Sequence, residues 1–200
     1  MKTYPIFDAI KSKDNLDKIV RQYYLVNPTV SFQPRLEKAH EILHAISEKF
    51  LVPISHIKVT GSAHLGYSFI KQRDFLEKQS DLDLAIIDAR LYNFYFEKIL
   101  ADTWQYSKKD KFGYSYINSQ KVHNLDMYKE WLTKGLIHEK YLPNIDCVNE
   151  FKKFFNELSV NNTDTFKSIS ACIYSSENTF KLKQISSIHR WSLGMLKDKK

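Results

Sequence analysis

Two acids on an otherwise apolar stretch constrain this chain more than any other feature. Residues 80–87 read SDLDLAII, a run typical of a buried β-strand. Because strand side chains alternate between faces, Asp81 and Asp83 are predicted to project from the same face. Like charges side by side repel unless a cation lies between them, and Mg²⁺-type cations prefer carboxylate oxygens. The pair therefore predicts a cation site. The alternatives are that both acids lie on a solvent-exposed strand face, or that they prevent an edge strand from pairing with other molecules.

The composition is that of a globular protein with a basic surface. The 200 residues are enough for one domain with a real core, and a content of 43% hydrophobic and 26% charged residues argues against disorder. The net charge of +7 favours polyanionic partners such as nucleic acid or nucleotides. The alternative is that the basic residues, which are scattered along the chain, only make the surface polar.

The cysteines and the lengths of the apolar runs indicate the cellular compartment of the protein. Cys147 and Cys172 are far apart and have no His or Cys neighbours at metal-ligand spacing, which indicates a reducing compartment rather than a disulfide framework. The first residues, MKTYPIFDAIKSKD, lack the apolar core of a signal peptide, and no apolar run approaches the length of a membrane span. We therefore expect a cytoplasmic protein without a membrane partner.

The remaining pattern predicts helices around a few strands. Asp14 is expected to cap the first helix, Pro34 to begin the second, and Asp88 to begin a long helix after the acidic strand. Strands are predicted over 55–60, 81–88 and 167–174, and helices over 14–25, 34–50, 88–102, 125–131, 146–158 and 178–196. This order indicates an α/β (α+β) fold with a small mixed sheet flanked by helices. We expect a single domain over 1–200, with 1–52 a helical N-terminal part packed on the core.

A dipeptide before the acidic strand completes a recognisable pattern. The first predicted strand ends at Gly61-Ser62, and the next strand carries Asp81-Leu82-Asp83. A Gly-Ser at the end of one strand and an Asp-x-Asp on the next resemble the signature of the nucleotidyltransferase superfamily, which is built on the DNA polymerase beta fold. The resemblance covers 59–87; the flanking helices fit the order of elements but carry no motif. It implies a nucleotidyltransferase-like domain with helical N- and C-terminal elaborations.

The resemblance also implies a metal-dependent enzyme and a role for each residue. Asp81 and Asp83 would hold two Mg²⁺ ions, one on the triphosphate of an NTP such as ATP and one that lowers the pKa of an acceptor hydroxyl. Gly61 and Ser62 would contact the triphosphate, and Ser80 would hold the loop by a side-chain-to-backbone hydrogen bond. A nucleoside monophosphate would pass to a hydroxyl of RNA, protein or a small molecule. Small bacterial members include antibiotic-modifying enzymes, toxin–antitoxin components and phage-defence enzymes, and nothing in the sequence selects among these settings.

Several side chains near the signature have two interpretations each. The segment between the Gly-Ser and the acids is longer than in compact family members, and it contains Lys71 and Arg73. These could reach a triphosphate or an acceptor phosphate, or belong to a solvated charged loop. His64 would touch a phosphate or have no role. One aromatic group could stack a base, although its helical spacing favours the core: Tyr92, Phe94, Tyr95 and Phe96.

The family usually carries a third carboxylate on a later strand, and the position of that acid is open here. The predicted strand 167–174 contains no acid; candidates elsewhere are Asp126, Asp146, Asp164 and Glu177. Without a third acid, the alternative function is a catalytically degenerate nucleotidyltransferase fold that binds nucleotide or RNA as a sensor or partner subunit. A further alternative is a basic nucleic-acid-binding module in which the acid pair is incidental. An exposed apolar patch on the terminal helices would indicate a protein partner.

Overall fold

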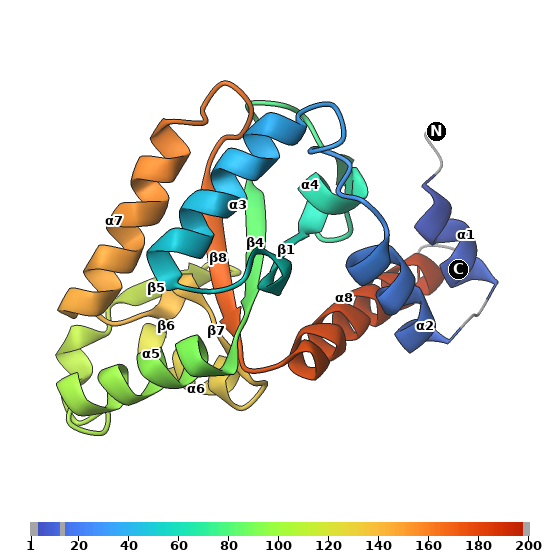
Figure 1. Ribbon diagram of the computed structural model, residues 1–200. Helices are drawn as coiled ribbons and strands as arrows, with labels where there is room; N and C mark the ends of the chain where they lie inside the picture. The colour runs from blue at the N-terminus through green and yellow to red at the C-terminus, as the bar shows by residue number, and fades with distance from the viewer. Residues whose placement is uncertain (1–3, 13–14, 198–200) are drawn as a thin grey trace.

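The computed structural model describes residues 4–12 and 15–197, and at its centre lies a four-stranded mixed sheet (Figure 1). The strand order is β1-β4-β8-β7. The strands are β1 Ile57–Thr60, β4 Leu82–Ile87, β8 Ile169–Tyr174 and β7 Leu136–Ile137. β4 is antiparallel to β1 and parallel to β8, and β7 is antiparallel to β8. The mixed α/β class expected from the sequence is confirmed, and so are the three predicted strands.

Eight α-helices surround this sheet within the described residues. They are α1 Pro5–Lys11, α2 Leu16–Val20, α3 Leu36–Phe50, α4 Gly61–Leu65, α5 Ala89–Asp102, α6 Asn124–Leu132, α7 Asp146–Val160 and α8 Glu177–Lys197. Shorter helical segments are the π-helix η1 Arg21–Val26 and the 3-10 turns η2 Ile54–His56, η3 Lys109–Lys111 and η4 Glu139–Tyr141. In the described part of the chain, no helix combines the length and apolar character that crossing a membrane requires.

Some helix starts differ from those predicted. The predicted cap Asp14 lies outside the described residues, and the side chain of Asn15 caps α2. Pro34 lies in a turn, and α3 begins two residues later because Arg35 still has a non-helical backbone. The prediction for α5 is confirmed, since the carboxylate of Asp88 accepts a hydrogen bond from the backbone N–H three residues along.

Five short strands were not predicted. β2 Tyr67–Ser68 pairs with β3 Arg73–Asp74, and β5 Tyr114–Ile117 pairs with β6 Gln120–His123. The fifth is β7, which has two residues. Strands of two residues are too short to show the alternation of polar and apolar side chains on which strand prediction depends, and β5 and β6 have no fully buried residue that would mark a core-facing side.

The two faces of the central sheet differ in chemistry. Alternate residues of β4 enter an apolar core under α3, α5 and α7, and these are Leu82, Leu84 and Ile86. The opposite face carries Asp81 and Asp83 at its polar end, and its apolar end joins a second core with α1, α2 and α8. Figure 1 shows α8 and the N-terminal helices on one side of the sheet and α3 and α7 on the other. The period of two along β4 therefore directs both acids toward α8.

Candidate functional site

A cavity of about 270 Å³ lies between the polar face of the sheet and α8. Five of the residues expected at the site line this cavity: Gly61, Ser62, Lys71, Asp81 and Asp83. They come from three segments: the turn into α4 after β1, the loop between β2 and β3, and the start of β4. The antiparallel pairing of β1 with β4 places the first and last of these segments side by side, because Thr60 pairs with Asp83.

Asp81 is held by two neighbours. Its Oδ2 lies 3.1 Å from the Lys71 ammonium, and its Oδ1 accepts a hydrogen bond of 2.9 Å from the Ser168 hydroxyl. Burial acts to raise the pKa of Asp81, but the hydrogen bonds from Lys71 and Ser168, together with the charges of Lys71 and Lys167, outweigh it. The pKa of Asp81 therefore lies below its usual value, and the group is anionic at neutral pH.

Asp83 is in the opposite electrostatic situation. Its side chain is open to the cavity but surrounded by protein, and burial followed by the charge of Asp81 raises its pKa above the usual value. The Lys71 ammonium, the Ser170 side chain and the Lys183 ammonium act against this rise without cancelling it. Burial is the larger cause of the rise and the charge of Asp81 adds to it, so a cation between the two carboxylates would lower the pKa of Asp83.

A third carboxylate lies near this pair, and the sequence did not indicate it. Glu139 begins η4, directly after the edge strand β7, and its charge acts on Asp83. The Ser170 side chain interacts with both carboxylates, and Ser170 is the residue that pairs with Asp83 across β4 and β8. Burial and the charge of Asp83 raise the pKa of Glu139 to about 7, against the effects of Ser170 and Lys152.

None of the four acids proposed from the sequence as a third ligand lines the cavity. Asp164 is bound to the Lys38 ammonium at 2.6 Å. Asp126 and Asp146 are exposed in the first turns of α6 and α7, and Glu177 is exposed at the start of α8. Asp146 also does not cap α7, whose N-cap is Ile145.

The acid pair fits a hard divalent cation with an incomplete protein shell. Two carboxylates reach the cavity, and Lys71 is the ammonium that lies within ion-pair distance of one of them. Among the residues that the structure describes, no three His, Cys, Asp or Glu side chains form a ready ligand cluster. A cation here would therefore complete its shell with water or substrate oxygens, as Mg²⁺ commonly does when one or two carboxylates hold it.

The other two residues of the expected site lie outside the cavity lining. Ser80 is buried, and its hydroxyl accepts a hydrogen bond of 2.9 Å from the backbone N–H of Leu76, which fixes the loop before the acids. Arg73 is exposed on β3. Of the two cations in this segment, Lys71 alone lines the cavity.

His64 is a structural residue. It is 4% exposed, its Nδ1 lies 2.9 Å from the Thr29 hydroxyl, and its Nε2 lies 2.6 Å from the carbonyl oxygen of Tyr23. Burial lowers the pKa of this imidazole below its usual value. Both ring nitrogens are therefore used within the protein.

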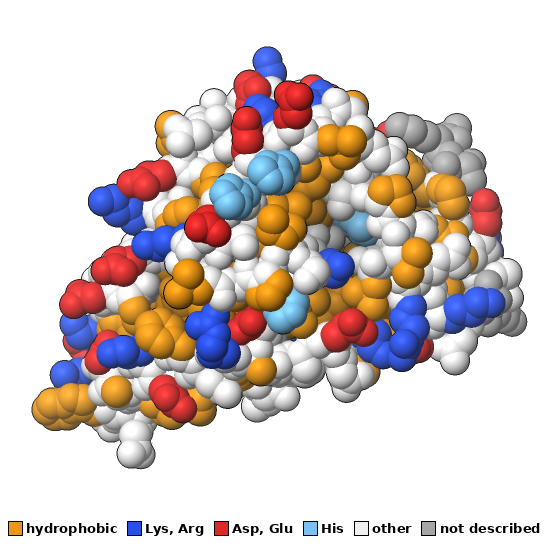
Figure 2. All heavy atoms as spheres, in the orientation of Figure 1, with side chains coloured by type: hydrophobic (Ala, Val, Ile, Leu, Met, Phe, Trp, Pro, Cys, Tyr) orange, Lys and Arg blue, Asp and Glu red, His pale blue; other side chains and the backbone are white. Residues whose placement is uncertain are grey.

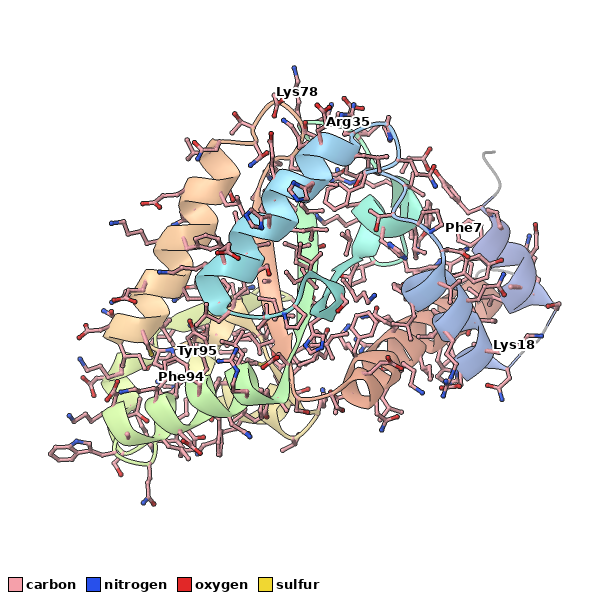
Figure 3. All side chains as sticks on the ribbon, viewed as in Figure 1. Phe7, Lys18, Arg35, Lys78, Phe94 and Tyr95 are labelled. Atoms are coloured by element: carbon pink, nitrogen blue, oxygen red, sulfur yellow. The ribbon has the colours of Figure 1, made fainter. Side chains whose placement is uncertain are left out.

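The aromatic group on α5 lies mostly in the core. Tyr95 is buried, and Tyr92 and Phe96 pack against the same cluster. Phe94 is 45% exposed and, with Tyr95, lines a separate cavity. Figure 3 shows Phe94 and Tyr95 on α5, on the opposite side of the sheet from α8. These rings do not reach the carboxylate cavity.

Comparison of the chain with protein-family models, with curated proteins and with solved structures gave no match.

Proposed function

We propose that this protein is a magnesium-dependent nucleotidyltransferase with the nucleotidyltransferase-like fold. The observation that carries the proposal is that the Gly-Ser turn and the Asp-x-Asp pair line the same cavity, although eighteen residues separate them in the sequence. The pairing of β1 with β4 accounts for this meeting. The donor would be an NTP such as ATP, and the acceptor a hydroxyl on RNA, protein or a small molecule.

Asp81 and Asp83 would hold the magnesium ions. When bound, the metal supplies positive charge to the phosphate oxygens and lowers the pKa of the attacking hydroxyl. The raised pKa of Asp83 supports this assignment, because a cation between the two carboxylates would lower that pKa. Lys71, whose ammonium already lies at the acid pair, would add its charge to the triphosphate side of the cavity.

Gly61 and Ser62 would bind the triphosphate. Gly61 has a φ of +62° and lies against the Asp83 carboxylate. The backbone comes closer to the acid pair here than it could if residue 61 had a side chain. Ser62 follows on the cavity wall with a hydroxyl that can donate to a phosphate oxygen. Glu139 is not part of the cavity lining, and it would act on the site through its charge on Asp83 and through Ser170.

Transfer of label tests the proposal. The protein would be incubated with each α-³²P-labelled NTP, Mg²⁺, and either total RNA or cell lysate. We expect labelled product from the wild type and none from Asp83→Asn, which keeps the shape of the side chain and removes its charge. Asp164→Asn is the matched control, since this acid is exposed and bound to Lys38. Equal labelling by wild type and Asp83→Asn would refute the proposed site.

A nucleotide-binding protein without transfer activity is the second candidate. It is favoured by Ser170, which occupies the β8 position beside Asp83 where the family resemblance leads us to expect an acid. This candidate predicts Mg²⁺-dependent NTP binding that depends on Asp83 but yields no labelled product. The basic-module alternative instead predicts RNA binding that is unchanged in Asp81→Asn and Asp83→Asn. On the face seen in Figure 2, basic and acidic side chains intermingle without a single basic patch.

A further inference from the structure

One face of α8 forms the wall of the cavity opposite the sheet. Lys183, Gln184 and Ser187 line the cavity, and their spacing of one, three and four residues places them on adjoining positions of one helical face. α8 lies beside the N-terminal helices, away from α3 and α7 (Figure 1). Nothing in the Gly-Ser or Asp-x-Asp pattern requires polar side chains on this wall.

Gln184 has no partner within the described part of the protein. The residue is 6% exposed, and its side-chain amide makes no hydrogen bond to any residue that the structure describes. The amide atoms are not among the fully buried polar atoms that lack a partner, so they are open to the cavity, where water or a ligand can bond to them. Since Gln184 lines the cavity, a bound molecule with both a donor and an acceptor would supply what the protein does not.

The direct contacts of the Lys183 ammonium with the described residues are to neutral groups, the Ser187 hydroxyl and the Trp131 ring, whose centroid lies 5.8 Å away. The ammonium donates a hydrogen bond of 3.0 Å to the Ser187 hydroxyl and has no carboxylate within 4.0 Å among the described residues. Lys181 on the same helix is different, because its ammonium lies 2.9 Å from Asp17. The charges of Lys183 and Asp83 nevertheless act on each other, so this ammonium lies within electrostatic range of the acid pair.

Aromatic rings border the same space. Tyr24, Tyr67 and Phe69 line the cavity together with the α8 wall. Aromatic faces bind the flat surface of a nucleobase, whereas an amide binds its edge. The cavity volume of about 270 Å³ lies just below the usual range for ligand pockets, about 300–1,000 Å³, so the cavity suits a small molecule rather than a polymer.

We infer that Gln184 recognises the nucleobase of the NTP through two hydrogen bonds to its edge. The amide N–H₂ donates to the base, and the amide oxygen accepts from it. The inference rests on the proposed function, because the phosphates of the same nucleotide would lie at Asp81, Asp83 and Lys71. Lys183 would lie between the base, at Gln184, and the phosphates, at the acid pair, and its ammonium would face the phosphates. Gln184 is thus a specificity residue and takes no part in the chemical step.

Binding of the four NTPs tests this assignment. Dissociation constants of ATP, GTP, CTP, UTP and inorganic triphosphate would be measured by calorimetry in Mg²⁺. Gln184→Glu replaces the N–H₂ donor by an acceptor, and Gln184→Met removes both groups at similar length. We expect the ratio between the best and worst NTP to fall by about 5- to 150-fold in both variants, the range of one bidentate contact to a base. The triphosphate affinity of Gln184→Met should stay within about twofold of the wild-type value.

The controls separate this inference from the proposed function. Gln120→Glu adds the same charge at an exposed position on β6, and its NTP ratios should equal those of the wild type. Mg²⁺-dependent NTP binding whose base ratios are unchanged in both Gln184 variants would overturn the inference and leave the proposed function standing. A wild type that binds all four NTPs equally would also overturn it. A wild type that binds neither NTP nor triphosphate would overturn the proposed function and this inference together.

Discussion

Gly61 lies so close to the Asp83 carboxylate that position 61 has no room for a side chain. A Cβ atom built on Gly61 would lie 2.9 Å from Oδ2 of Asp83, and Gly61 has a φ of +62°. The short distance follows from the antiparallel pairing of β1 with β4, which brings the end of one strand onto the first residues of the other. The turn and the acid pair therefore form one unit, in which a change to the backbone of the turn moves a carboxylate.

Gly61→Ala is expected to destabilise the fold and to disturb the site. The left-handed backbone alone costs a residue with a Cβ about 1–2 kcal/mol, and the contact with Asp83 adds to this cost. Urea unfolding would measure the loss, and Mg²⁺-dependent NTP binding would fall with it. Gly113→Ala is the matched control, because Gly113 has no positive φ and the nearest atom to its added Cβ is 3.7 Å away. Equal effects of the two substitutions would contradict the proposed contact.

Magnesium is expected to stabilise the wild type through the acid pair. A ligand at one hundred times its dissociation constant raises the free energy of unfolding by about 2.7 kcal/mol if it binds only the folded state. Thermal unfolding with Mg²⁺, compared with unfolding in a chelator, would show this as a rise in Tm. The rise should disappear in Asp83→Asn and persist in Asp164→Asn. A rise of the same size in both variants would place the cation elsewhere.

The contribution of Glu139 to the stability of the folded protein should fall as pH increases from about 4.5 to about 7, whereas His138, whose pKa burial lowers to about 4, acts in the opposite direction in this range. The Glu139 pKa of about 7 in the folded state exceeds the ordinary value of 4.5, so in this range Glu139 binds more protons in the folded state than in the unfolded state. The stabilising contribution is complete below pH 4.5 and is lost as pH rises through 7. Glu139→Gln does not titrate, so in metal-free buffer the unfolding free energy of the wild type should drop relative to that of Glu139→Gln as pH rises over this range. An unchanged slope would show that Glu139 titrates normally.

The core under α3 gives a test of the fold itself. Ile46 is fully buried against the sheet, and Ile46→Ala should lower the unfolding free energy by about 2–5 kcal/mol through lost burial and a cavity. Leu36, at the start of the same helix, is 72% exposed although its spacing fits the apolar stripe. Leu36→Ala should change stability by no more than about 0.5 kcal/mol. Chemical denaturation of both variants would distinguish the buried face of α3 from its exposed end.

Local patterns in the sequence determined which residues could form the acid pair. Alternation along 80–87 was enough to place Asp81 and Asp83 on one face, and the structure has both on the cavity side of β4. Asp88 was identifiable as a helix cap because capping depends on neighbouring residues alone. These features depend only on residues that are close together in the sequence. They can therefore be predicted from periodicity and from the chemistry of single side chains.

Only the tertiary structure decided what surrounds the pair. Glu139 reaches Ser170 because a two-residue strand pairs antiparallel with β8, and no periodic signal marks a strand so short. Gln184 enters the cavity because α8 packs across the sheet, about one hundred residues along the chain from the acids. His64 is buried because Tyr23 and Thr29 bond to it. Such contacts join segments with no fixed spacing in sequence. The position of Glu139 and the cavity wall therefore depend on packing, whereas the acid pair depends on the alternation along one strand.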